Sequence, residues 1–200
     1  MATLGWIGRL CLAAAAVNLS IIIVQPVAGA PTVKGDAAAW TEIVTALKKQ
    51  RTISYRAKTT TGPTDNTPGI TEFVPPDTKH TIVPGLLESF SVGNKYWARR
   101  IGDKWDCSSA ANGLPVGAPV WDQQGTVIAK RLPAVVIGGM PTRGYTYTFT
   151  GTIKGQTVTG NQKLYIAVQT GLPRRAVVEE NFTFDFYDYG ARIAITPPCK

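Results

Sequence analysis

Runs in which apolar and polar residues alternate occupy much of the chain after residue 52. Side chains of a strand point to its two faces in turn, so this period is typical of a sheet with one covered face. The first series contains Ile53, Tyr55, Ala57 and Thr59. Later series contain Tyr145, Tyr147 and Phe149, then Leu164, Ile166 and Val168, then Phe182, Phe184 and Phe186, and lastly Ile193 and Ile195. The pattern predicts consecutive antiparallel strands through the C-terminal half.

The middle of the chain mixes strand and turn signals. Residues 70–74 and 80–83 are short strand candidates, and the two prolines between them favour a sheet edge or a corner. Residues 87–107 predict a three-stranded meander, because Gly-Asn and Gly-Asp pairs separate its apolar runs. Residues 108–119 are rich in Ala, Gly and Pro and predict a loop.

Two segments of the sequence predict helices. Asp36 can cap a helix that ends at Gln50, and residues 120–132 predict a short second one. The segment from 134 to 140 is apolar and fits either state. The apolar face of the first helix must pack on something apolar, and it consists of Trp40, Ile43, Val44 and Leu47. We therefore expect an α+β domain in which one or two helices cover a strongly curved antiparallel sheet.

The first 30 residues have the composition of a secretory signal peptide. Arg9 is their single charge, an apolar run follows to Val24, and small residues end the segment. We expect cleavage to start the mature chain at Ala30 or Pro31, leaving residues 31–200 as a single domain. An uncleaved membrane anchor is the alternative, although the run is shorter than the roughly 20 residues that span a bilayer. Cys11 stands too early to be a lipidation site.

The expected product is a basic protein of the periplasm. The formal net charge of +8 loses only Arg9 with the leader and becomes +7. In that compartment the abundant anions are lipid headgroups and cell-wall polymers, so nucleic acid is not the expected partner. No membrane span is expected after cleavage. Dispersed solubilising charge is the favoured interpretation of the basic residues, and a collar that attracts anions is the alternative.

Leader removal leaves two cysteines, Cys107 and Cys199. Disulfides persist outside the cytoplasm, so pairing is the expected state. Such a bond would close a loop of about 90 residues and contribute on the order of 4 kcal/mol. Two free buried thiols are the alternative.

Catalytic and metal-binding motifs are missing from the sequence. It has no G-x-S-x-G, H-E-x-x-H, P-loop or C-x-x-C motif, and its single histidine, His80, reads as an exposed strand residue. Four acids are candidates for a glycosidase pair, but a solvated strand face explains them more simply, namely Glu179, Glu180, Asp185 and Asp188. We expect no catalytic residues, no metal and no cofactor.

The C-terminal residues resemble a known family. A strand, a "TGLP" turn from Thr170, a further strand, "YDYG" and an "I-x-I-x-P-P" ending are similar to periplasmic lipoprotein-carrier and lipid-binding proteins of the LolA and LppX type. The resemblance implies an unclosed β half-barrel whose concave apolar face is covered by helices and receives acyl chains. This sequence lacks the lipidation cysteine of the lipoprotein members, so a soluble protein is expected.

Three functions follow, in order of expectation. The first is a non-enzymatic periplasmic binder or carrier of a lipid or other amphiphile, with anionic ones included. The second is a structural or interaction module of the envelope with a filled core and a protein partner, and the third is a secreted hydrolase. For the first, the expected ligand-binding residues are Trp40, Ile43, Val44, Leu47, Tyr55, Tyr145, Tyr147, Phe149, Leu164, Ile166 and Val168.

Overall fold

A computed structural model describes residues 29–62, 67–93, 95–107, 111–112, 120–153 and 156–199. Their helices are α2 (Ala37–Gln50) and the short 3₁₀ helix η1 (Val120–Asp122). Their strands are β1 (Thr32–Gly35), β2 (Tyr55–Thr61), β3 (Gly69–Val74), β4 (Thr78–Val83), β5 (Leu87–Val92), β6 (Lys95–Arg100), β7 (Ala111–Asn112), β8 (Gly125–Ile137), β9 (Met140–Ile153), β10 (Gln156–Ala167), β11 (Pro173–Val178) and β12 (Phe182–Tyr187).

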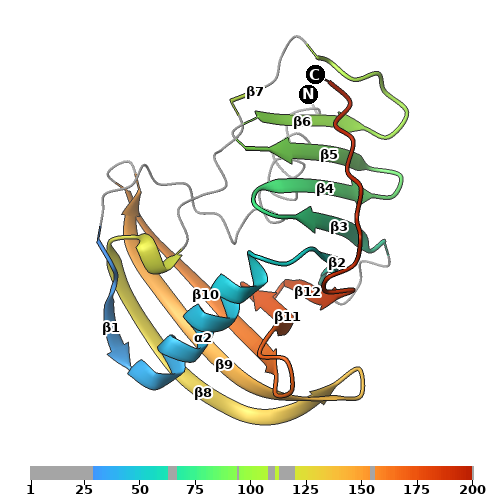
Figure 1. Cartoon of the computed structure of the whole chain (residues 1–200). Coiled ribbons are helices and arrows are strands. Elements are labelled where there is room, and N and C mark those ends of the chain that lie inside the picture. The colour runs from blue at the N-terminus through green and yellow to red at the C-terminus, as the bar shows by residue number, and fades with distance from the viewer. Residues whose placement is uncertain are drawn as a thin grey trace.

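The strands form one curved sheet that does not close. It has twelve strands in the order β1-β8-β9-β10-β11-β12-β2-β3-β4-β5-β6-β7, with β1 and β7 at its edges. Neighbours are antiparallel except β1 and β8, which are parallel. β12 and β2 join a half made of β8 to β11 to a half made of β3 to β7 (Figure 1). The expected α+β class and curved antiparallel sheet are confirmed.

The helix lies against one half of the concave face. Asp36 caps it by accepting a hydrogen bond from the backbone N–H of Ala39 at 2.9 Å, as the sequence predicts. α2 packs mainly on β1 and on β8 to β11. Its residues Trp40 and Ile43 are buried there. This single long helix is the cover that the amphipathic pattern demands.

Cross-strand register shows which side chains share the concave face. Tyr145 of β9 pairs with Leu164 of β10, which pairs with Ala176 of β11, which pairs with Phe184 of β12. All four are buried in the cluster that contains the apolar face of α2. Phe184 then pairs with Thr59 of β2, so the same face continues into the other half of the sheet.

The convex face carries a smaller core. Phe90 of β5 pairs with Trp97 of β6 on this side, and Cys199 is buried with them. Residues 191–199 reach it as an extended arm that runs past β3 to β6 (Figure 1). Cys199 bonds to Cys107, with 5.6 Å between their Cα atoms, which confirms the predicted disulfide. Ile195, which was expected in a strand, belongs to this arm and packs against the smaller core.

The predicted second helix is wrong. Residues 120–122 form only the η1 turn, and from Gly125 onward the segment is strand β8, which also takes in residues 134–137. Val127 and Ala129 are buried while Ile128 and Lys130 are exposed, so the alternation of a strand outweighs the helical propensity of the segment.

Two further expectations need correction. The prolines between β3 and β4 make a turn inside the sheet, not at its edge. The third strand of the meander is absent from residues 104–107, and β6 pairs instead with β7. Most of the expected loop from 108 to 119 lies outside the described residues.

The predicted leader also lies outside the described residues, apart from Gly29 and Ala30. Strand β1 begins at Thr32, directly after the expected cleavage positions, and Pro31 is buried. Among the described residues, no helix combines the length and the hydrophobicity needed to cross a membrane.

Candidate functional site

Most of the predicted ligand-binding residues meet in one cluster. Val44 and Leu47 pack at its margin, whereas the remainder are buried within it, namely Trp40, Ile43, Tyr145, Tyr147, Phe149, Leu164 and Ile166. Two predicted residues lie elsewhere. Val168 follows the end of β10 and is 51% exposed, while Tyr55 lies on the concave face of β2. The helix and β8 to β11 therefore pack directly on each other.

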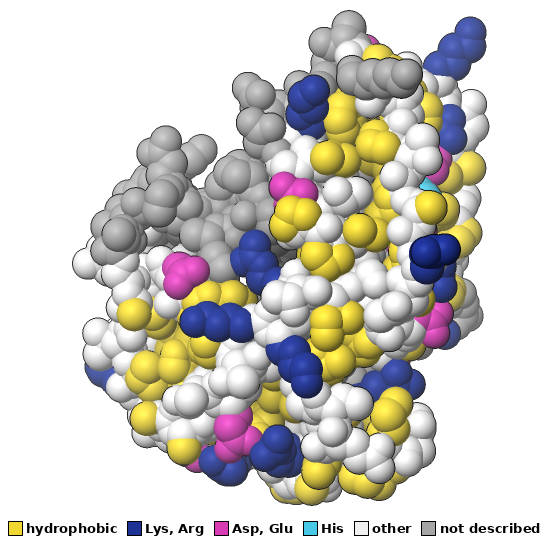
Figure 2. Space-filling model, in the orientation of Figure 1, with side chains coloured by type: hydrophobic (Ala, Val, Ile, Leu, Met, Phe, Trp, Pro, Cys, Tyr) yellow, Lys and Arg dark blue, Asp and Glu magenta, His cyan; other side chains and the backbone are white. Residues whose placement is uncertain are grey.

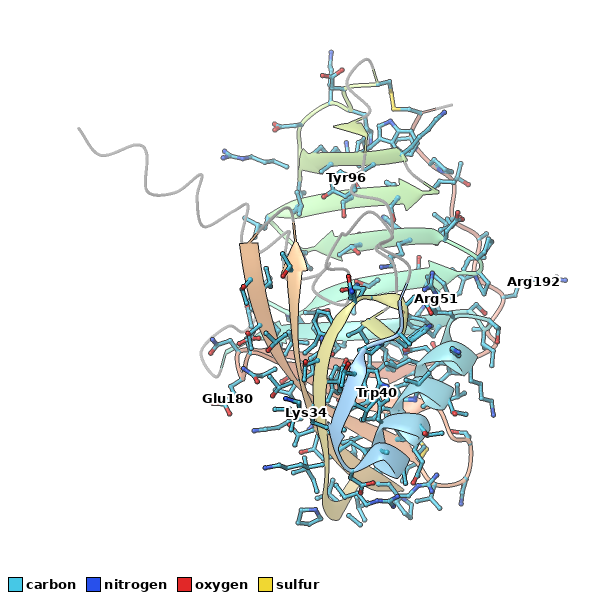
Figure 3. All side chains as sticks on the ribbon, turned by 90° about the vertical axis from the view of Figure 1, so that its left-hand side faces the viewer. Lys34, Trp40, Arg51, Tyr96, Glu180 and Arg192 are labelled. Carbon is cyan, nitrogen blue, oxygen red and sulfur yellow. A yellow bond between two sulfur atoms is a disulfide. The ribbon has the colours of Figure 1, made fainter. Side chains whose placement is uncertain are left out.

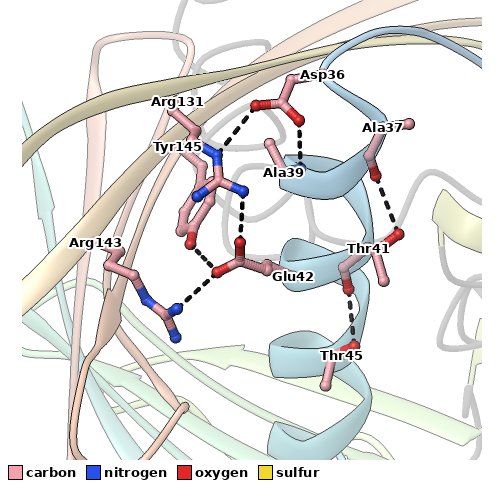
Figure 4. Close-up of polar contacts among 9 residues, drawn as sticks. All are labelled: Asp36, Ala37, Ala39, Thr41, Glu42, Thr45, Arg131, Arg143 and Tyr145. Carbon is pink, nitrogen blue, oxygen red and sulfur yellow. Dashed lines mark hydrogen bonds and ion pairs between the residues drawn. The ribbon is translucent and has the colours of Figure 1, made fainter.

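Polar bonds hold α2 in this position (Figure 4). Tyr145 Oη donates a hydrogen bond to Glu42 Oε2 at 2.5 Å. Arg131 of β8 and Arg143 of β9 make ion pairs with the same carboxylate at 2.7 and 2.9 Å. The Tyr145 hydrogen bond and the two guanidinium groups lower the pKa of Glu42. Glu42 therefore stays ionised and anchors the helix to both strands.

The tyrosines of this cluster do not leave their hydroxyls free for a ligand. Burial, and then the bond to Glu42, raises the pKa of Tyr145 to about 12. Tyr147 Oη donates to Gln162 Oε1 at 2.6 Å, and its ring meets Trp40 edge-on at 5.5 Å between centroids. Both hydroxyls are satisfied within the protein, so the helix-covered part of the face is closed.

The rest of the concave face has a different character. Phe186 of β12 is followed across β2 to β6 by a register-matched row of small side chains, which consists of Ala57, Thr71, Thr81, Ser89 and Ala98. Thr71 and Thr81 share a hydrogen bond of 3.0 Å between their hydroxyls. Thr59 Oγ1 is buried and has no hydrogen-bond partner. The five residues of this row and Thr59 are together called the small-residue wall.

A second row, which contains three aromatic side chains and a lysine, lies beside this wall. It runs across the register from β2 to β6 through Tyr55, Phe73, Lys79, Ser91 and Tyr96. The rings of Tyr55 and Phe73 stack at 5.0 Å, and Phe186 meets Tyr55 edge-on at 5.6 Å. Figure 3 shows Tyr96 on the upper strands and Arg51 where α2 ends. We call this set the aromatic row.

Lys79 is the cation of the aromatic row. Burial, and to a smaller extent the charge of Arg51, lowers the pKa of its amine to about 8. Residues 69–83 alternate between the two faces of the sheet. Because many of them are small or polar, this alternation does not show which face is apolar. Only the register of the five strands shows which of their residues are neighbours.

The opposite face of these strands carries a ladder of charges. His80 Nε2 lies 3.1 Å from Glu88 Oε1, and Nδ1 lies 3.5 Å from Glu72 Oε2. Arg99 makes an ion pair with Glu88, and Arg56 makes one with Glu72. His80 is therefore partly buried and stacked on a ring, that of Phe90, instead of exposed as expected.

The four acids considered for hydrolysis do not converge. Asp185 pairs with Arg175, Asp188 with Arg56, and Glu180 with Lys163. Glu179 accepts a hydrogen bond from the backbone N–H of Asn161. Within the described ranges, no group of three or more His, Cys, Asp or Glu side chains is placed to hold a metal ion.

The basic residues are dispersed. Lys and Arg side chains stand at several separate places on the face seen in Figure 2, with other residues between these places. Arg131, Arg99 and Arg175 are each engaged by carboxylates of the protein. A continuous basic collar is therefore not present on that face.

Comparisons with known proteins give matches in structure only. No protein-family model and no curated protein matches the sequence. LprF from Mycobacterium bovis matches with a TM-score of 0.51 and 14% identity, over 85% of this chain and 99% of that one. The lipoprotein LppX from Mycobacterium tuberculosis matches with a TM-score of 0.55 and 12% identity, over 81% of this chain and all of that one. The chain therefore has the unclosed half-barrel fold of LprF and LppX, as the resemblance of its C-terminal residues predicts.

Proposed function

We propose that the mature protein is a non-enzymatic periplasmic binder or carrier of a lipid or other amphiphile. The observation that carries the proposal is the small-residue wall on the concave face of β2 to β6. Where α2 covers the sheet, the same face is filled by Tyr145, Leu164 and Phe184. In the neighbouring row, which continues from Phe186 beyond the helix, the positions are Ala, Thr and Ser. Their side chains project less far from the sheet than those under α2, and we infer that an acyl chain takes up the difference.

The ligand lies, in this proposal, between the C-terminal end of α2 and the concave face of β2 to β6. Tyr55 and Phe73 line it with aromatic surface. The predicted residues of the helix cluster form the closed end of the same space, with Val44 and Leu47 at its margin. The unpartnered hydroxyl of Thr59 supports this placement, because a buried hydroxyl without a hydrogen bond is costly unless a ligand or water satisfies it.

An envelope interaction module with a filled core is the second candidate. One observation favours it, which is that most residues expected to line the ligand space pack tightly against one another. In that case the protein would act through a surface contact with another envelope protein. The two candidates differ in whether the small-residue wall can accept added volume.

Ala57→Phe is designed to separate these candidates. Ala57 is buried in the middle of the concave face, and its replacement breaks no side-chain hydrogen bond. If the space above it receives an acyl chain, the variant should fold with a free energy of unfolding within about 1 kcal/mol of wild type. Saturable binding of a fluorescent fatty acid should weaken at least about tenfold, because the ring occupies the ligand's place.

The matched control is Thr60→Phe. Thr60 lies in the same strand as Ala57, and its side chain points to the opposite face of the sheet. It should leave the affinity for the fluorescent fatty acid unchanged. A filled core would give the contrary result, with Ala57→Phe losing about 1 to 3 kcal/mol through overpacking. If the folded wild type also binds no amphiphile of any chain length, the carrier proposal is wrong and the interaction module replaces it.

Export is tested by the mass of the mature chain. We expect the protein from the periplasmic fraction to begin between Ala28 and Pro31, because the leader ends in small residues and β1 starts at Thr32. Intact-mass measurement decides the position. A full-length product retained in the membrane would contradict both cleavage and the periplasmic assignment.

A further inference from the structure

Lys79 occupies an unusual position for a lysine. The register of β3 and β4 places it directly across from Phe73, and that of β4 and β5 places it across from Ser91. It therefore points to the concave face, in the same row as the stacked rings of Tyr55 and Phe73. Lysine side chains normally keep their amines in water, so a concave, aromatic setting needs a reason.

A second cation stands beside it. Arg51 caps the C-terminal end of α2, and its charge acts on both Lys79 and Tyr55. The carbonyls at the end of a helix offset part of this positive charge, but only by a fraction of a unit. The end of α2 and strand β4 thus bring two like charges to the aromatic row.

Among the described residues, neither cation has an anionic partner. Across the described ranges, no carboxylate lies within ion-pair distance of Lys79 or Arg51, and neither side chain makes a hydrogen bond. The acids nearest in the register are already engaged on the opposite face, as Glu72 is by Arg56. Both side chains are partly buried, and a partly buried cation is ordinarily paired. The arrangement lacks an anion.

We propose that Lys79 and Arg51 bind the anionic headgroup, a carboxylate or a phosphate, of the amphiphile held on the concave face. The inference rests on the proposed carrier function and specifies its ligand. The ammonium and the guanidinium together offer the donors that such a headgroup accepts. The rings of Tyr55 and Phe73 then contact the first methylenes of the chain, and the small-residue wall beside them receives the rest. The protein thereby selects acidic amphiphiles over neutral ones.

The test compares two probes that differ only in the headgroup. Hexadecanoate and hexadecanol are titrated as competitors of a fluorescent fatty acid on the mature protein. Wild type should bind hexadecanoate at least about tenfold more tightly, which is the effect of one charge-assisted hydrogen bond. Lys79→Met keeps the aliphatic stem and removes the charge, so it should reduce the preference to within about twofold without changing the affinity for hexadecanol. Arg51→Gln should reduce it in part.

Lys95→Met is the matched control, because Lys95 is an exposed lysine on the opposite face of β6. It should retain the full preference. Inorganic phosphate alone separates a headgroup site from a free-anion site: it should compete only weakly, and competition as strong as that of hexadecanoate would overturn the headgroup assignment. Folded Lys79→Met that keeps the tenfold preference would also overturn it. Equal binding of both probes by wild type removes the inference and leaves the carrier function, whereas binding of neither removes both.

Discussion

Replacing Cys107 and Cys199 together by serine is expected to lower the free energy of unfolding by about 3 to 4 kcal/mol. The bond joins positions 92 residues apart, so its loss frees a long loop of the unfolded chain. It also releases the arm of residues 191–199. Without the arm, the convex faces of Phe90 and Trp97 lose their cover. Urea unfolding of the mature wild type and the double variant measures the difference.

The arm should detach before the sheet unfolds. At its start it is held by Ser54, whose hydroxyl donates to the carbonyl of Ala191 at 2.6 Å and whose own carbonyl accepts from Gly190 at 2.8 Å. At its end the disulfide and the packing of Ile195 hold it. We therefore expect hydrogen exchange to rise in β5 and β6 of the variant and to stay unchanged in β9 and β10.

Reduction of wild type provides the control. Dithiothreitol should lower the stability of wild type to that of the double variant and leave the variant itself unchanged. Two observations would contradict the prediction. One is alkylation of both thiols in the native protein without reductant. The other is a double variant as stable as wild type.

The fold could be predicted where large apolar residues alternate. Tyr145, Tyr147 and Phe149 predict a strand and its buried face, and the structure agrees. The helix predicted at residues 120–132 is wrong, because cross-strand pairing with β9 decides the conformation of this segment. The strand predicted at Ile193 and Ile195 is wrong as well, since they lie in an arm without strand partners among the described residues.

The candidate site was harder to predict for a related physical reason. Hydrophobic patterns select large side chains, and those with the strongest signal, such as Ile43 and Ile166, are the ones that fill the core. A wall made of Ala, Thr and Ser gives no such signal. Lys79 and Arg51 come together only through the docking of a helix end and the register of the neighbouring strands, which short-range patterns do not contain.

Lys79→Met is expected to stabilise the protein without ligand. Burial lowers the pKa of Lys79 from its ordinary 10.5 to about 8 in the folded state. Between these two values the unfolded chain binds more protons than the folded one, so stability rises as the pH rises through about 8 to 10.5. Below pH 8 the charge opposes folding in full. At pH 7 the uncharged variant should therefore be more stable by on the order of 2 to 3 kcal/mol.

Urea unfolding at pH 7 and at pH 10.5 tests the sign as well as the size of this effect. The advantage of Lys79→Met over wild type should shrink by more than half at the higher pH, because wild-type Lys79 is by then neutral in the folded state. Lys95→Met, whose lysine is exposed, should show no advantage at either pH. An unchanged or lower stability of Lys79→Met at pH 7 would mean that the amine is not deprived of solvation. Saturating hexadecanoate should narrow the gap at pH 7, because the ligand supplies an anion to Lys79, binds wild type more tightly and therefore stabilises it more than the variant.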